Sequence, residues 1–191
     1  MKKMKRLVGI AILSGMGFAL LHRLQKGGAE QVTPLTPDSA SCSPEKAMIQ
    51  EWTKLLTSDA RVYAGMFNSL QRTADGSVKN PEKIIREWCS RTSYKWPEST
   101  AARLCREYLI PAAETANRET CIKYAGLLLQ SVGNAGITSE QKQELVLDDT
   151  TVMAYTEWNS QELYTECCVK IVTPAWYQNG TVIERGIAVL C

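Results

Sequence analysis

The stretch that decides the fold lies at residues 43–70 and has the sequence SPEKAMIQEWTKLLTSDARVYAGMFNSL. Ser43 followed by Pro44 is a typical helix start, because serine caps free backbone N–H groups and proline is tolerated in the first turn. Large apolar residues then recur at intervals of three and four up to Leu70, which predicts a long amphipathic helix. A break near Ser58 and Asp59 would divide this helix in two.

Further helices are predicted before residue 145. One begins after Asn80 at Pro81, one spans residues 97–111, and one spans residues 113–132 before a glycine-rich end. The spacing of Thr138 and Gln141 is that of a capping box, which predicts another short helix. The first part of the domain is therefore expected to hold four to five helices.

The periodicity changes after residue 149. Segments 150–158, 162–173 and 181–191 are rich in Val, Ile, Thr, Tyr and Trp, and turn-forming pairs separate them. This pattern predicts a C-terminal three-stranded antiparallel meander. Helices followed by strands indicate an α+β fold, and residues 44–191 have the length of a single domain with one core.

Residues 1–26 have the pattern of a signal anchor or a signal peptide. Four basic residues precede an uncharged apolar run over residues 7–21. As a helix this run spans about 22 Å, which is shorter than a hydrocarbon core of about 30 Å, so length alone does not decide between anchor and cleaved signal. We favour the uncleaved anchor, because the small residues Ala19 and Ala29 are poorly placed for a peptidase. The basic start favours an N-in orientation with the domain outside.

Residues 27–43 are rich in Gly, Ser, Thr and Pro and are predicted to form a flexible linker. Within the apolar run, Ala11, Gly15 and Ala19 are spaced by four and could form a packing stripe against another membrane helix. Small residues are also simply common in such segments, and this is the simpler interpretation.

Charge is distributed unevenly along the chain. The first 26 residues hold 6 of the 22 lysines and arginines and no acid, so the remainder has 22 − 6 = 16 basic residues against 20 acidic ones. The exported part is therefore mildly acidic, and no basic patch with interleaved aromatic residues favours nucleic-acid binding. A glycine-rich phosphate loop is also lacking, and we predict no cofactor.

Seven cysteines are unusually many for 191 residues, and an exported chain favours their pairing. Three disulfides are predicted among the six cysteines of the domain, with the connectivity left open. These candidates are Cys89, Cys105, Cys121, Cys167, Cys168 and Cys191. Cys42 lies in the linker as a free thiol or as a link to a second copy or a partner. Metal binding is not predicted, because the only histidine is His22 and no Cys-x-x-Cys occurs.

Catalytic patterns are weak. Without a histidine in the domain, nucleophilic mechanisms that use a histidine base are excluded. Ser43 and Lys46 have the spacing of penicillin-binding enzymes, but the companion motifs are missing and the serine is a natural helix cap. A pair of acids for glycoside cleavage remains an alternative, since five acidic residues cluster near the junction of helices and strands. They are Asp148, Asp149, Glu157, Glu162 and Glu166.

The sequence thus predicts a single-pass, membrane-tethered protein of the bacterial inner membrane. Its periplasmic domain is expected to bind other envelope proteins or itself rather than to act as an enzyme. The order of elements resembles, in outline only, bitopic inner-membrane components of bacterial secretion machines, which implies a role in a secretion or conjugation-type assembly. The alternative is a small periplasmic or secreted hydrolase, similar to a glycosidase, that uses paired carboxylates.

Overall fold

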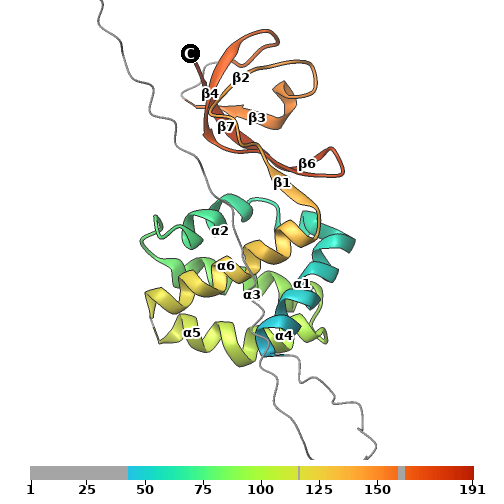
Figure 1. Ribbon diagram of the computed structural model, residues 1–191, viewed down its shortest axis with the longest axis vertical. Coiled ribbons are helices and arrows are strands. Elements are labelled where there is room, and N and C mark those ends of the chain that lie inside the picture. The colour runs from blue at the N-terminus through green and yellow to red at the C-terminus, as the bar shows by residue number, and fades with distance from the viewer. Residues whose placement is uncertain (1–42, 116, 159–161) are drawn as a thin grey trace, which may run out of the picture. The chain divides into compact units, whose positions relative to one another are not determined.

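The computed structural model describes residues 43–115, 117–158 and 162–191, in which helices come first and strands follow (Figure 1). The predicted α+β class is confirmed. The described helices are α1 (Pro44–Asp59), α2 (Phe67–Ala74), α3 (Pro81–Lys95), α4 (Thr100–Leu104), α5 (Ile110–Glu114) and α6 (Arg118–Asn134). Shorter helical turns are η1 (Ala60–Tyr63), η2 (Cys105–Leu109) and η3 (Val152–Ala154).

The start of α1 follows from its first residues. The Ser43 hydroxyl accepts a hydrogen bond from the backbone N–H of Lys46 at 3.3 Å, and Pro44 occupies the first turn. This bond satisfies one of the N–H groups that a helix start leaves free. The cap interpretation of Ser43 is confirmed, and α1 ends at Asp59, where the break was predicted.

The helix predicted over residues 97–111 has different boundaries. It begins at Thr100 because the Ser99 hydroxyl accepts the N–H of Ala102 at 3.1 Å and caps the helix there. It does not end at Pro111, since α4 continues through the π-helical turn η2 into α5. Pro111 is the second residue of α5, directly after the π-helical turn, so the helix continues past a residue that has no N–H to donate to the preceding turn.

The helix predicted over residues 113–132 is observed as α6, which begins at Arg118. The Asn117 side-chain oxygen accepts the N–H of Thr120 at 3.2 Å and caps this start. The predicted inward face is confirmed, because Cys121 and Leu128 are buried. At the far end, Gly136 has a φ of +72°, a conformation that ends helices and that glycine adopts without strain.

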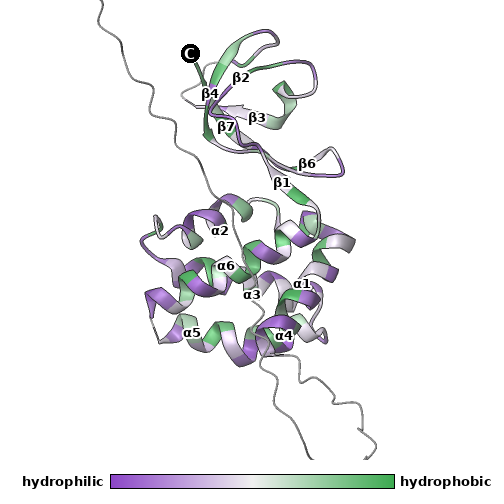
Figure 2. Ribbon diagram, viewed as in Figure 1, coloured by the Kyte–Doolittle hydropathy of each residue, from purple (hydrophilic) through white to green (hydrophobic). Residues whose placement is uncertain are grey.

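A cluster of aromatic residues forms the centre of the helical core. Trp52 of α1 and Trp88 of α3 are fully buried and meet edge to face, with ring centroids 6.3 Å apart. Tyr63 stacks on Trp88 at 4.2 Å, and its hydroxyl is 2.6 Å from that of Thr92. Burial raises the pKa of Tyr63 well above its usual range. Each helix carries hydrophobic and hydrophilic stretches (Figure 2), as an amphipathic helix must.

The strands form two sheets in place of the predicted single meander. They are β1 (Ile137–Ser139), β2 (Glu144–Val146), β3 (Tyr155–Glu157), β4 (Cys168–Thr173), β5 (Trp176–Gln178), β6 (Thr181–Glu184) and β7 (Gly186–Leu190). One sheet has the order β1-β5-β6 and the other β2-β4-β7-β3. All neighbours are antiparallel except β3 and β7, which are parallel.

Two predicted elements are corrected by this topology. The short helix expected from the Thr138 and Gln141 spacing is absent from the described residues 137–146, which form β1 and β2 instead. The segment 150–158 forms η3 and the parallel edge strand β3, so it is not a member of an antiparallel meander. Pairing of β1 with β5 and of β2 with β4 outweighs the local capping signal.

Gly186 allows the chain to bend between the two sheets. A Cβ atom at this position would lie 2.5 Å from the carbonyl oxygen of Thr173, 2.6 Å from the ring of Tyr155 and 2.7 Å from the nitrogen of Ala175. These contacts are too short for any side chain, so only glycine lets β7 pass this close to its neighbours. The bend moves the chain from the smaller sheet at β6 into the larger sheet at β7.

A buried carboxylate joins the smaller sheet to the helices. Glu184 of β6 accepts hydrogen bonds from the backbone N–H groups of Phe67 at 2.6 Å and Asn68 at 3.1 Å, and from the Asn68 amide at 2.9 Å. These groups lie at the start of α2, where helix N–H groups are free. Asn68 in turn accepts the indole N–H of Trp176 at 3.0 Å. Nothing in the sequence around Glu184 predicted this contact.

The predictions for the N-terminal part fall outside the described residues. They comprise the segment 1–26 with its stripe of Ala11, Gly15 and Ala19, the linker up to residue 42, and Cys42. Within the described ranges, none of the helices has the length and the apolar character needed to cross a bilayer.

Candidate functional site

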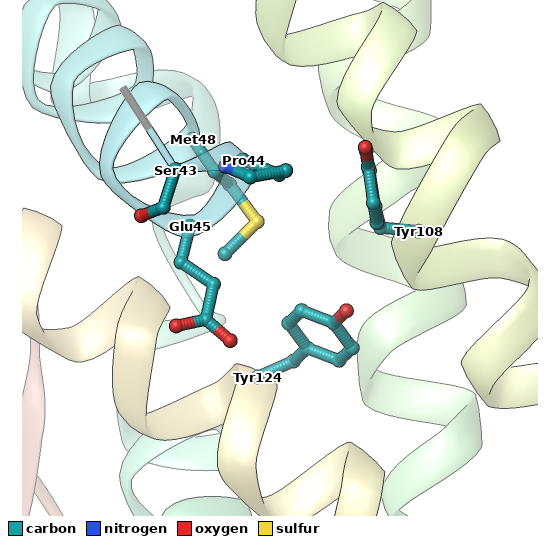
Figure 3. Close-up of a pocket in the computed structure, with 6 residues that line it drawn as sticks. All are labelled: Ser43, Pro44, Glu45, Met48, Tyr108 and Tyr124. Carbon is teal, nitrogen blue, oxygen red and sulfur yellow. The ribbon is translucent and has the colours of Figure 1, made fainter. Parts of the chain in front are cut away.

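The most apolar cavity among those found in the described residues lies at the start of α1 (Figure 3). It measures about 300 Å³, which is the lower end of the range for ligand pockets. Side chains from α1, η2 and α6 converge on it. They are Ser43, Pro44, Glu45, Met48, Tyr108 and Tyr124. The helix start recognised in the sequence thus forms one wall of the pocket. The sequence did not predict that Tyr108 and Tyr124 also line it.

The opposite wall depends on the π-helical turn η2. This turn holds Tyr108 half-buried at the cavity, and Cys105 of the same turn is fully buried in the core. A π-helical turn inserts an extra residue into a helix and is frequent at functional sites. Because the turn is wider than an α-helical one, it displaces Tyr108 from the position that a continuous helix would give it.

The charged groups at the edge of the pocket neutralise each other. The ammonium group of Lys123 lies 2.6 Å from a carboxylate oxygen of Glu45, and this contact raises the pKa of Lys123. Burial raises the pKa of Tyr124, so its hydroxyl stays protonated at neutral pH. The pocket therefore offers apolar walls, two phenol hydroxyls and a charge pair that is already satisfied.

The five acidic residues predicted as a cluster divide between two other cavities. Glu157 and Glu162 line a cavity of about 320 Å³ together with Arg185. A second cavity of similar size is lined by Asp148, Asp149 and Glu166. The sequence prediction of one acidic cluster is therefore only partly matched by the geometry.

Asp148 holds a turn together. One oxygen of its carboxylate accepts hydrogen bonds from the N–H and hydroxyl groups of both Thr150 and Thr151, at 2.7 to 2.9 Å. The Thr150 hydroxyl and the other donors together hold the pKa of Asp148 well below its usual range. A carboxylate stabilised in its charged form is a poor proton donor, so Asp148 has the properties of a turn residue rather than of a general acid.

Two of the predicted cysteines lie side by side on the larger sheet. Cys168 of β4 and Cys191 after β7 are both exposed, and their sulfur atoms are 2.8 Å apart. The backbone N–H of Cys191 donates to the carbonyl of Cys168 at 3.0 Å, which fixes the two residues opposite each other. The contact with Cys168 raises the pKa of the Cys191 thiol to about 11.

The other four cysteines are buried at three places. Cys89 of α3 and Cys105 of η2 lie in the helical core, and the thiol contact between them raises the pKa of Cys89 far above its usual range. Cys121 belongs to the same core, where its sulfur lies 3.8 Å from the carbonyl oxygen of Ala112. Cys167 lies in the separate core of the sheets. The structure therefore brings four of the six candidates into two pairs, and it places Cys121 and Cys167 in different cores.

Comparison with known proteins identifies no relative: no family model, curated protein or solved structure matches this chain. Within the described ranges, no group of three or more His, Cys, Asp or Glu side chains has the arrangement of a metal site.

Proposed function

We propose that this chain is a non-enzymatic, membrane-tethered envelope protein whose exported domain binds another envelope protein. The pocket at the start of α1 carries this proposal. Its walls are the apolar parts of Met48, Pro44 and the rings of Tyr108 and Tyr124. Tyrosine is a frequent anchor in protein interfaces, because its large ring buries apolar area while its hydroxyl forms a hydrogen bond.

The expected occupant is an uncharged apolar side chain of the partner protein. Glu45 and Lys123 already form an ion pair at the edge, so neither demands an opposite charge from the partner. A volume of about 300 Å³ admits a side chain of the size of leucine or phenylalanine with its backbone. The two tyrosine hydroxyls could then bond to the partner's backbone.

Further support comes from exposed apolar residues on the strands. Val146 of β2 and Val172 of β4 are large apolar residues that face solvent, as do Met153 of η3 and Trp158 and Tyr164 in connecting segments. Tyr94 of α3 is the other large exposed apolar residue in the described part. Five of these six residues lie within residues 146–172, in the strand-forming part of the domain.

Site-specific photocrosslinking in intact membranes tests the binding proposal. With the crosslinker at Tyr108, we expect one discrete product that is lost when Tyr124→Ala is added to the same chain. Tyr94 is the matched control position, because it is 89% exposed on α3 and does not line the pocket. Equal products from both positions, or a product that Tyr124→Ala leaves unchanged, would refute binding at this pocket.

The tether belongs to the same proposal. Residues 1–26 are proposed to anchor the chain in the bacterial inner membrane with the N-terminus inside and the domain in the periplasm; cleavage of a signal to give a periplasmic or secreted protein is the alternative. Fractionation combined with sequencing of the mature N-terminus separates the two. Replacing Cys42 by serine tests the proposed covalent link, since a dimer or partner band on a non-reducing gel should disappear.

A second candidate function is hydrolysis by paired carboxylates, as in a glycosidase. It is favoured by one observation, that Glu157 and Glu162 line the same cavity with Arg185 beside them. If this candidate is correct, purified protein should cleave a polysaccharide such as peptidoglycan, and both Glu157→Gln and Glu162→Gln should abolish cleavage without unfolding the chain. Glu166→Gln is the matched control, because Glu166 lines a different cavity.

A further inference from the structure

The exposed cysteine pair has the position of a cross-strand bridge. Cys168 and Cys191 face each other across the antiparallel strands β4 and β7, in continuation of the pair formed by Val169 and Leu190. Their sulfur atoms are 2.8 Å apart, so neither backbone has to move far for a bond to form. Cys167, the neighbour in sequence, is buried in the core of the sheets with its sulfur against the carbonyl oxygen of Tyr164. Cys167 lies just before β4 and is buried, whereas Cys168, the first residue of β4, is exposed, so the two adjacent cysteines have different surroundings.

The second pair lies in the helical core. Cys89 of α3 and Cys105 of the π-helical turn are 1% and 0% exposed, belong to the same buried core, and lie on two elements that pack directly against each other. Cys105 takes this position in the same turn that directs Tyr108 to the pocket. A bridge here would join α3 to η2, the turn that also carries Tyr108 of the proposed binding site.

We infer that the chain forms two disulfides, Cys89–Cys105 and Cys168–Cys191, and that these differ in access to reductants. In each, one thiolate attacks a disulfide of an oxidant, either a thiol-disulfide oxidoreductase or oxidised glutathione, and the second thiolate then displaces it. The new S–S bond forms, the oxidant's S–S bond breaks, and the oxidant takes up the electron pair and two protons. Bridging in the cell rests on the export proposed above, whereas the pairing rests on the sulfur distance between Cys168 and Cys191 and on the shared core position of Cys89 and Cys105.

The difference in exposure gives the bridges different chemistry. A thiol from solution reaches Cys168 and Cys191 without unfolding, because both are exposed. It reaches Cys89 and Cys105 only after the helical core opens. The bridge on the sheet is therefore open to exchange with reductants or with a cysteine of a partner, while the bridge in the core is protected until the core opens.

Oxidation of the purified full-length chain in a glutathione buffer tests the pairing without reference to location. After alkylation and digestion with trypsin, we expect two linked peptide pairs, EWCSR with LCR and residues 143–170 with GIAVLC. Trypsin leaves Cys167 and Cys168 in one peptide, so single serine variants decide between them. Cys168→Ser should abolish the link to Cys191, and the matched control Cys167→Ser should retain it.

Graded reduction of the oxidised chain tests the difference in access. The bridge to Cys191 should open roughly tenfold or more faster than the bridge to Cys105 under native conditions, and the two rates should converge in denaturant. Major links that contain Cys121 or Cys167, or opening of the core bridge first, would overturn the inference. Cys89→Ser, which removes the bridge in the core, changes a buried residue and can prevent folding. Cys191→Ser, which removes the bridge on the sheet, changes an exposed residue, so the test remains informative with this variant.

Alkylation of cells with a membrane-permeant reagent before lysis separates the pairing from the export proposal. If both bridges are present in cells, the result supports both the pairing and the exported location. Bridges that form in the glutathione buffer but are absent from cells refute the exported location and leave the pairing intact. Failure in the buffer itself refutes the pairing.

Discussion

Replacing Glu184 by alanine should release the smaller sheet from the start of α2. The substitution leaves the N–H groups of Phe67 and Asn68 without their acceptor at a buried site. Each donor left unsatisfied costs about 1–3 kcal/mol, and water can enter part of the space that the side chain vacates. We therefore expect the free energy of unfolding to fall by roughly 3 kcal/mol, which is a large share of the 5–15 kcal/mol typical of a domain.

Urea unfolding followed by tryptophan fluorescence measures this loss, because Trp176 is hydrogen-bonded to Asn68 within the same contact. Glu157→Ala is the matched control, since Glu157 is exposed in β3 and its loss should change stability by less than about 0.5 kcal/mol. Equal stability of the two variants would refute the view that Glu184 holds the sheet to the helices.

The pH dependence provides an independent check on Glu184. Burial raises the pKa of this carboxyl, and the hydrogen bonds from Asn68 and Phe67 oppose but do not cancel the shift. Between the unfolded pKa of about 4.3 and the higher folded pKa, the native state binds more protons than the unfolded state. The contribution of Glu184 to stability should therefore decrease as pH rises through the folded pKa. Relative to Glu184→Gln, the native chain should gain stability when the pH is lowered from 7 toward 4.

Two glycines and one aspartate allow further tests. Gly186→Ala should destabilise the chain by about 3 kcal/mol or more in urea unfolding, because the new methyl group would clash with backbone atoms of Thr173 and Ala175. Gly133→Ala should do the opposite and stabilise by about 0.5–1 kcal/mol, because the added methyl group has open space in α6; a loss of stability would contradict this. Asp148→Asn should make the chain lose less stability on acidification. Because the pKa of Asp148 is lowered in the folded state, its carboxylate stabilises the fold above the unfolded pKa of about 3.9, and this contribution is lost as the pH falls below that value. Parallel acid-unfolding curves for the two chains would contradict the turn role.

The helical part of the fold was largely predictable because its signals are local. Ser43-Pro44 and Asn80-Pro81 mark the starts of α1 and α3, and the spacing of apolar residues identifies their buried faces. The errors lie where two local signals compete. Pro97 resembled a helix start in the sequence. The helix begins after Ser99 instead, because the Ser99 hydroxyl accepts the N–H of Ala102 and caps the helix there.

The strands were harder to predict because their partners are distant in sequence. Residues 137–139 carry the start signal of a helix, but their pairing with β5 involves residues about 40 positions further along. The bend at Gly186 likewise depends on Thr173 and Tyr155, which no local pattern relates to it. Such contacts decide the sheet order, and a single sequence does not display them.

The candidate site depends both on local sequence signals and on contacts between residues that are distant in sequence. The first turn of α1 was recognisable as a helix start, but Tyr108 reaches the pocket only because η2 is a π-helical turn, and this turn has no signature in a single sequence. The cysteines were predicted as a set without connectivity. Their two contacts follow from the packing of α3 on η2 and from the pairing of β4 with β7.

The contact between Glu184 and Asn68 also bears on the lifetime of the folded state. It joins residues 116 positions apart, whereas the helices of the core pack through shorter loops. Contacts that close long loops tend to form late in folding, so losing this one should act mainly on the unfolding rate. A loss of about 3 kcal/mol expressed in that rate alone shortens the folded lifetime roughly 150-fold. Glu184 would then be one determinant of how long the smaller sheet stays attached to the helices, beside the hydrogen bonds of Trp176 and Gln178.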